Sequence, residues 1–284
     1  MEEFSMICDM HTHSVFSDGT YTPKEIIDTA ITSGLSSVAL TDHNTVDGLP
    51  DFIAAAQNKN IEIVLGCEFS VDHCGKELHL LGLFIKPEYF GQITEMMQKL
   101  MSLKELSNID LINSLSAAGF DLNYEEIKSS TPNGKINRAH IAEAMQKRGY
   151  VNSIAEAFET YLSKSGGYYK EPPHLSVFET IDFINSIGAV SVLAHPFLNL
   201  SEEELKHFLP EAKSRGLIGM ECYYSLYDET TTRLSLQIAK DFGLLCSGGS
   251  DFHGSRKPDI SLGVGKGNLK IPYEWYLELK GKAK

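Results

Sequence analysis

The sequence of 284 residues is short of cysteine and of long apolar runs, and both shortages exclude classes of protein. Its five cysteines form no Cys-x-x-Cys pair and are odd in number, which argues against a disulfide framework or a structural zinc knuckle. No run of about 18 apolar residues occurs, and the N-terminal MEEFSM lacks the features of a signal peptide. We therefore expect reduced thiols, no membrane span and a cytoplasmic location.

Positive charge is also scarce. Lysine and arginine number 25 against 38 acidic residues, so the net charge is -13, which disfavours stable, sequence-independent binding of duplex nucleic acid. A small phosphorylated substrate stays compatible with this charge, because bound divalent cations reverse the local field and carboxylates hold such cations. With 42% hydrophobic side chains, the chain has enough apolar material for a full-sized core.

Short apolar runs alternate with helical patterns in the first and last parts of the chain, which is the rhythm of βα units. One helix is well marked between the first two runs, with Thr22 as N-cap, Pro23 at its first position and Gly34 at its end. The expected strands are residues 7–12, 36–42, 61–69, 78–85, 189–194, 217–223 and 244–250. The crossover rule makes most of these parallel, so we expect a closed or nearly closed seven-stranded, TIM-like βα barrel.

Helical signals replace the strand pattern between residues 101 and 170. Asn137 is a candidate helix cap, and Ser153 with Glu156 has the spacing of a capping box. The segment SGGYYKEPP then has the composition of a linker. We expect an α/β barrel of residues 1–100 and 171–284, interrupted by a helical cap subdomain of residues 101–170.

Two histidines follow the first expected strand, in the segment DMHTH. Residues i and i+2 of a strand point to the same side, so His11 and His13 project together and Asp9 shares their face. Two adjacent imidazoles pack poorly in a core but bind a metal ion well. Taken alone, this pair is a weak motif.

Histidines and carboxylates recur where the other expected strands end or begin. In a βα barrel the carboxyl ends of the strands face one mouth, so these side chains should converge. The nine candidate metal ligands are His11, His13, Asp18, His43, Glu68, His79, His195, Asp251 and His253. Each candidate also has an interpretation without metal binding. A lone histidine is more often a core or surface residue, and Asp18 beside Gly19 suits a turn. His79 is the weakest candidate, because it lies near the start of its strand.

The number of these groups favours more than one cation. A zinc or manganese ion takes four to six ligands, some of them water, so six histidines and three carboxylates exceed the needs of a single ion. If Glu68 bridges, the nine groups can serve three cations. Carboxylates gathered without cations would also repel one another strongly.

The segments DMHTHSVFSDG, LTDHN, GCEFS, LHLLG, VLAHP and GGSDFHG, in this order, resemble the metal-binding motifs of the PHP (polymerase and histidinol phosphatase) family. The resemblance extends from residue 7 to about 265 and includes INRAHIAEAM, which is similar to the branch of nucleoside 3',5'-bisphosphate phosphatases and RNase AM-like enzymes. It implies a distorted seven-stranded barrel with two to three divalent metals, manganese, zinc or iron.

The resemblance also implies ligand sets and roles. The first metal would use His11, His13, Glu68 and Asp251, the second Glu68, His79 and His195, and the third Asp18, His43 and His253. A metal-bridging hydroxide would attack phosphorus in line, with Asp251, His195 and His253 as the candidate catalytic residues.

Substrate selection is expected from the helical insertion. Arg138 grips phosphate bidentately in this interpretation, with His140 beside it, and Arg256 adds charge at the rim. The alternatives are a solvated helix start for Arg138, a helix-face position for His140 and a plain surface role for Arg256.

The leading hypothesis is hydrolysis of the 5'-phosphate of a small nucleotide, such as AMP or a nucleoside 3',5'-bisphosphate, or of short RNA. The same metal cluster would serve histidinol phosphate or another sugar phosphate. A non-catalytic metal-binding or nucleotide-binding module is an alternative of another class, although all nine ligand positions are filled. A C–N hydrolase of the amidohydrolase type is less favoured, because no lysine is placed to form a carbamylated bridge. Metal identity and oligomeric state stay open.

Overall fold

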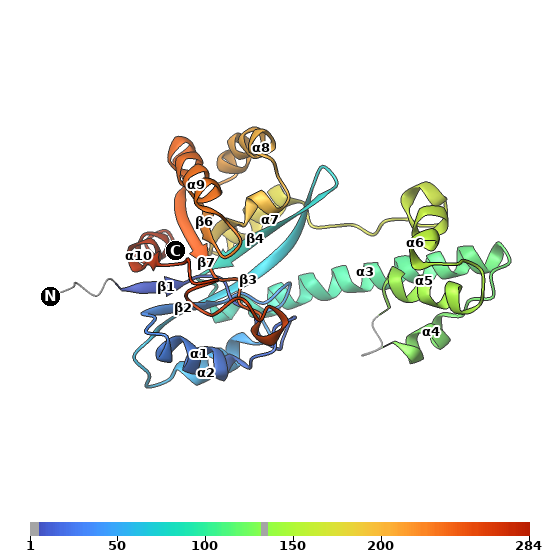
Figure 1. Cartoon of the computed structure of the whole chain (residues 1–284), viewed down its shortest axis with the longest axis horizontal. Helices are drawn as coiled ribbons and strands as arrows, with labels where there is room; N and C mark the ends of the chain where they lie inside the picture. Colours follow the sequence, from blue (N-terminus) through green and yellow to red (C-terminus); the bar gives the residue numbers. More distant parts are fainter. Residues whose placement is uncertain (1–5, 132–135) are drawn as a thin grey trace. The chain divides into compact units, whose positions relative to one another are not determined.

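The computed structural model describes residues 6–131 and 136–284, and the chain divides into two compact units (Figure 1). One unit joins Met1–Glu95 to Leu175–Lys284 and contains the β-sheet, whereas Met96–His174 form the other, which is helical. Within the described ranges, no helix has both the length and the apolar character needed to cross a membrane.

The sheet has eight strands in the order β7-β6-β5-β4-β3-β2-β1-β8. Backbone hydrogen bonds from Met10 N to Gly248 O (3.1 Å) and from Asp251 N to His11 O (2.9 Å) link its two sides and nearly close a barrel. The strands are β1 (Ile7–Asp9), β2 (Ser37–Leu40), β3 (Glu62–His73), β4 (Lys76–Leu83), β5 (Val190–Ala194), β6 (Gly219–Tyr224), β7 (Leu245–Gly249) and β8 (Ile271–Pro272). The barrel prediction is confirmed. The extra strand, β8, is two residues long and pairs antiparallel with β1.

Strand β4 runs opposite to its neighbours, which the expected βα alternation did not anticipate. It forms a hairpin with β3 and is antiparallel to β5 as well. The tight turn between β3 and β4 uses Cys74 and Gly75, both with positive φ. As a result, the start of β4 lies beside the end of β5, where His79 pairs with Ala194.

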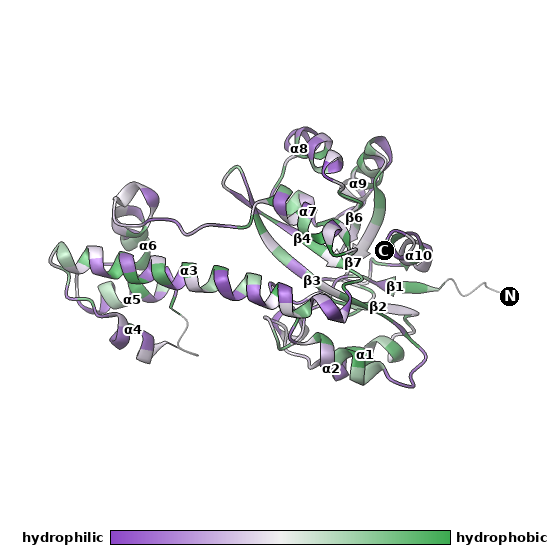
Figure 2. Ribbon diagram, turned by 180° about the vertical axis from the view of Figure 1, so that it is seen from behind, coloured by the Kyte–Doolittle hydropathy of each residue, from purple (hydrophilic) through white to green (hydrophobic). Residues whose placement is uncertain are grey.

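The described α-helices that lie wholly within the barrel unit surround this sheet: α1 (Pro23–Thr32), α2 (Leu49–Ala56), α7 (Val177–Ser186), α8 (Glu202–Ser214), α9 (Glu229–Phe242) and α10 (Tyr273–Lys280). The predicted start of α1 is confirmed, since Thr22 caps it in a full capping box with Glu25. Helices such as α8 and α9 carry hydrophilic and hydrophobic residues along their length, the pattern of helices that cover a core (Figure 2). One apolar cluster in the core of this unit includes Met10, Val64, Leu81, Val192 and Ile271.

Residues 96–174 have a core of their own, built from helices that flank short turns. The long helix α3 (Phe90–Ala117) crosses the division between the units, and it is followed by α4 (Tyr124–Ser130), α5 (Arg138–Lys147) and α6 (Ile154–Ala157). Asn137 caps α5 as predicted. Leu111, Leu115, Ile141, Met145 and Leu162 are fully buried among these helices. The role of this unit as a substrate cap stays a prediction.

Candidate metal centre

Glu68 is the hub of the cluster. This carboxylate lies in β3, is fully buried, and is surrounded by five imidazoles. Its Oε2 lies 3.1 Å from His11 Nε2, 3.2 Å from His13 Nε2 and 3.0 Å from His43 Nδ1, and its Oε1 lies 2.8 Å from His79 Nδ1 and 3.0 Å from His195 Nε2. Side chains from β3, β4 and the segments after β1, β2 and β5 therefore converge on one carboxylate.

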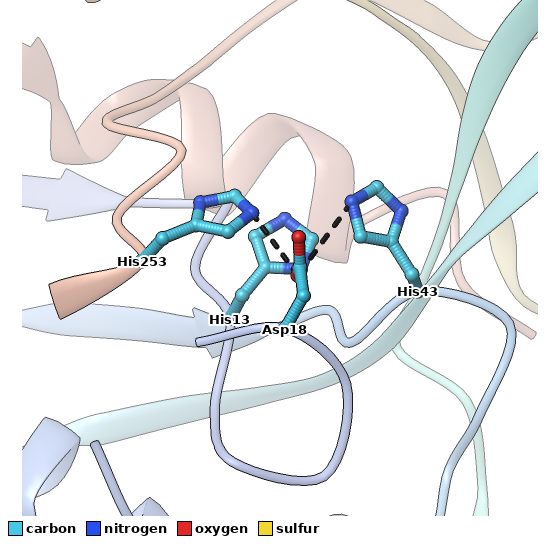
Figure 3. A group of neighbouring side chains, drawn as sticks. All are labelled: His13, Asp18, His43 and His253. Carbon is cyan, nitrogen blue, oxygen red and sulfur yellow. Dashed lines mark ion pairs between the residues drawn. The ribbon is translucent and has the colours of Figure 1, made fainter. Parts of the chain in front are cut away.

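Asp18 marks a second group at the edge of the cluster. Its Oδ1 lies 3.1 Å from His253 Nε2 and 3.9 Å from both His13 Nδ1 and His43 Nε2. Figure 3 shows the three imidazoles arranged around this carboxylate, which comes from the loop after His13. The Asp18 side chain is 41% exposed, so this group faces solvent more than Glu68 does.

Asp251 completes the cluster from the segment after β7. Its Oδ1 lies 3.3 Å from His13 Nε2 and 3.7 Å from His11 Nε2. The structure brings all nine predicted ligands into four overlapping groups, within each of which the ligand atoms lie no more than 4.8 Å apart. The groups are His13, Asp18, His43 and His253; His11, Glu68 and His195; His11, His13 and Asp251; and His43, Glu68 and His79.

The backbone around these ligands is strained and closely packed. His195 and Asp251 have positive φ values of 25° and 55°, a conformation that L-residues rarely adopt and that occurs at functional sites. Gly249 approaches His11 so closely that an added Cβ would lie 2.2 Å from His11 Cβ. Strand β1 ends at Asp9, earlier than predicted, and His11 and His13 follow in the segment hydrogen-bonded to residues after β7.

The side chains of the cluster have pKa values that are shifted in different directions from their ordinary values. Burial alone would raise the pKa of Glu68, but the charge and hydrogen bonds of the surrounding imidazoles hold it well below its usual range. Burial lowers the pKa of His43 to about 4. Burial alone would lower the pKa of His79, but the hydrogen bonds and negative charges of Glu68 and Glu77 together raise it to about 9. This divergence is typical of functional sites.

The donor atoms fit divalent cations. His11 Nε2 and His13 Nε2 lie 3.0 Å apart and aim at the same region, and both belong to one of the candidate groups. Among the described residues, His13 Nδ1 is buried without a hydrogen-bond partner, as expected of a nitrogen that binds a cation. Imidazole nitrogen with carboxylate oxygen suits zinc, manganese and iron.

Three side chains contact the candidate ligands in ways that the sequence did not predict; of these, Lys257 was expected only as positive charge at the rim, beside Arg256. Tyr224 and Lys257 donate hydrogen bonds to Asp251 Oδ2 over 2.9 Å and 2.6 Å. Glu221 contacts His11 Nδ1 at 2.9 Å. A lone carboxylate in the apolar run LIGMECY was a detectable signal for Glu221. Asp9 accepts backbone hydrogen bonds from His11, Ser250 and Gly263, so it braces the backbone.

The predicted substrate residues have identifiable contacts. Arg138 donates a hydrogen bond to the Leu162 carbonyl over 3.1 Å and stacks on Tyr169, with 4.2 Å from its guanidinium carbon to the ring centre. His140 completes the capping box of α5 by accepting a hydrogen bond from Asn137 N at Nδ1. Arg256 is exposed, and its neighbour Lys257 is the cation that contacts Asp251. Substrate binding by Arg138, His140 and Arg256 stays a prediction.

A barrel that gathers histidines and carboxylates around a buried glutamate defines the class of metal-dependent hydrolases. The PHP domain family matches residues 9–180, so the chain belongs to this family. The resemblance drawn from the motifs is thereby confirmed.

Similar proteins narrow the chemistry. A 5'-3' exoribonuclease of Haemophilus influenzae is 28% identical over 86% of this chain and 89% of its own length. A 3',5'-nucleoside bisphosphate phosphatase of Chromobacterium violaceum is 29% identical over 86% of each chain. A solved structure from Bifidobacterium adolescentis, assigned as a metal-dependent phosphoesterase, has 27% identity and a TM-score of 0.68, covering 98% of this chain and 97% of its own. These findings support a metal-dependent phosphoesterase, as predicted.

Proposed function

We propose that this protein hydrolyses the 5'-phosphate of small nucleotides, AMP or nucleoside 3',5'-bisphosphates, or of short RNA. The observation that carries the proposal is the convergence of five imidazoles on buried Glu68, beside Asp18 and Asp251. The relatives that act on RNA ends and on bisphosphates support the nucleotide class. A cytoplasmic location stays a prediction.

Two to three divalent cations, manganese, zinc or iron, are the proposed cofactors. The proposed ligand sets are His11, His13, Glu68 and Asp251; Glu68, His79 and His195; and Asp18, His43 and His253. When bound, such cations neutralise charge on phosphoryl oxygens and lower the pKa of coordinated water. Glu68 is the proposed bridge, since each of its oxygens faces a different set of imidazoles.

The chain's own residues then bind the substrate and transfer protons. Asp251, His195 and His253 are the proposed catalytic residues, because each places a titratable atom within the cluster. Arg138, His140 and Arg256 are the proposed contacts for the substrate phosphate, and a guanidinium suits a bidentate grip on phosphate. No serine or cysteine nucleophile is needed for this reaction.

A phosphate-release screen tests the proposal. Purified protein loaded with manganese is assayed on AMP, a nucleoside 3',5'-bisphosphate, 5'-phosphorylated RNA oligonucleotides and histidinol phosphate. We expect the highest kcat/KM on a 5'-phosphorylated nucleotide or oligonucleotide. A higher kcat/KM on histidinol phosphate would contradict the nucleotide class and favour a histidinol-phosphate or sugar-phosphate phosphatase. Release from none of them, with metal shown to be bound, would support a non-catalytic module instead.

A further inference from the structure

Glu221 is a buried carboxylate that touches two candidate metal ligands without joining the cluster. It lies in β6 and is 0% exposed. One oxygen, Oε1, lies 2.9 Å from His11 Nδ1, and the other, Oε2, accepts a hydrogen bond from the His195 backbone N–H over 2.7 Å. A single side chain therefore connects two ligand segments that are distant in the sequence.

The contact with His11 fixes which ring nitrogen is free. An ionised carboxylate can only accept hydrogen bonds, so the proton of the neutral ring must lie on Nδ1. The lone pair is then on Nε2, which lies 3.1 Å from Glu68 Oε2 and 3.0 Å from His13 Nε2. Nε2 is thus the nitrogen left to bind a cation.

The contact with His195 fixes the backbone. His195 has a φ of 25° and a ψ of 55°, outside the regions that L-residues favour. The charged hydrogen bond from its N–H to Glu221 offsets part of this strain. His195 Nε2 lies 3.0 Å from Glu68 Oε1, the oxygen other than the one that contacts His11.

We propose that Glu221 is a positioning residue for cation binding, which sets the tautomer of His11 and the backbone of His195 in the group His11, Glu68 and His195. The inference rests on the proposed metal centre and concerns binding rather than the choice of substrate. Outer carboxylates that orient a ligating histidine typically change metal affinity about 10- to 100-fold when they are replaced.

The substitution Glu221→Gln tests this role because it keeps the shape and changes only the hydrogen-bonding pattern. If the amide oxygen stays on His195 N–H, the amide NH₂ donates to His11 Nδ1 and moves the ring proton to Nε2, where it opposes a cation. Mn²⁺ titration of the chelator-treated protein by calorimetry should show roughly 10- to 100-fold weaker binding at the sites that include His11. Binding at Asp18, His43 and His253 should persist.

Glu62→Gln is the matched control. Glu62 also lies in a barrel strand and accepts a hydrogen bond from Tyr276 OH over 2.7 Å, but it belongs to none of the candidate metal groups among the described residues. We expect it to leave Mn²⁺ affinity unchanged. Wild-type affinity and stoichiometry in Glu221→Gln would overturn the inference, and so would an equal loss of affinity in both variants.

The tautomer of His11 can be measured in the wild-type protein. The inference can therefore be tested even if Glu221→Gln does not fold. Long-range ¹H–¹⁵N spectra of the Zn²⁺-loaded protein should show His11 protonated at Nδ1, and protonation at Nε2 would contradict the inference. If the wild type binds these cations but releases no phosphate, the proposed function fails while the role of Glu221 stands. If the wild type binds no cation, both fail.

Discussion

Glu68 and the five imidazoles around it are the side chains on which the metal centre depends. One nitrogen of each imidazole lies within 3.2 Å of a Glu68 oxygen, in a region from which solvent is largely excluded. Burying so many titratable groups is costly unless charges compensate one another. Bound cations would supply that compensation. Replacing one ligand should therefore lower the rate of hydrolysis more than it lowers the stability of the fold.

Replacing His195 or Asp251 with alanine should abolish turnover and leave the fold intact. Both residues are predicted to bind the metal directly. Replacing a direct ligand should lower kcat/KM by more than the roughly 10- to 100-fold loss of activity that is typical when a residue hydrogen-bonded to a ligand is replaced. The measurement is kcat/KM for the best substrate, with circular dichroism as the check on folding. His207, an exposed histidine in α8, provides the control. Full activity in His195→Ala, or an equal loss in His207→Ala, would contradict these roles.

Arg138→Ala should raise KM about tenfold or more with a smaller change in kcat, because a charged hydrogen bond to a substrate phosphate contributes about 1.5–3 kcal/mol. Steady-state kinetics on a 5'-phosphorylated nucleotide provides the measurement. Arg148→Ala is the control within the same helical unit, since Arg148 pairs with Glu126 over 2.6 Å. An unchanged KM in Arg138→Ala would leave this arginine with a structural role, through its hydrogen bond to the Leu162 carbonyl and its stacking on Tyr169.

Helix α8 shows how local sequence signals translate into structure. Ser201 and Glu204, which have the spacing of a capping box in the sequence, form one at the start of this helix, and Glu204 also pairs with Lys76 of β4 over 2.6 Å. The hydrogen bond from Lys76, followed by those from Ser201, lowers the pKa of Glu204 to about 2. The helix start is thereby tied to the β-hairpin beside the cluster.

The stabilising effect of Glu204 should depend on pH. Its folded-state pKa lies below the ordinary value of 4.5, so its contribution is complete above that pH and declines as the pH falls toward 2. Urea unfolding of Glu204→Gln should show lower stability than wild type at pH 7 and a smaller difference at pH 3. Glu203→Gln, one residue earlier, is the control. A difference that grows at low pH would contradict the assignment.

Local patterns predicted more of the elements than of their directions. Caps at Thr22, Asn137 and Ser201 were readable because a cap depends on residues a few positions apart. The reversal of β4 follows from its hairpin with β3, whose turn at Cys74 and Gly75 the βα interpretation overlooked. Its pairing with β5, more than 100 residues later, is the part that no local pattern encodes. His79 therefore looked misplaced in the sequence, although the reversal puts it 2.8 Å from Glu68.

The candidate metal ligands could be predicted from the sequence, whereas the residues that hydrogen-bond to them could not. Histidines and carboxylates beside apolar runs are conspicuous, so nine candidate ligands could be named, and the structure brings these nine side chains together. Glu221, Tyr224 and Lys257 act through hydrogen bonds across the barrel, and their partners His11 and Asp251 are fixed only by tertiary packing. Their roles become visible once the strands are placed side by side.

The barrel unit as a whole should be stabilised by the cations that its ligands bind. A ligand that binds only the folded state, at 100 times its Kd, adds about 2.7 kcal/mol to the free energy of unfolding. Chelation should therefore lower Tm and abolish phosphate release, and added Mn²⁺ should restore both. Protein in the same buffer without chelator is the control. A Tm and an activity that are insensitive to chelation would contradict a metal-dependent mechanism.

The central claim is that separate segments of the chain gather imidazoles and carboxylates in order to bind cations. Anomalous diffraction from crystals of the manganese-loaded protein tests it most directly. The account predicts anomalous peaks between Glu68 and its surrounding imidazoles, with another peak expected beside Asp18. Crystals in which these side chains point apart, with no anomalous signal among them at saturating manganese, would contradict the claim.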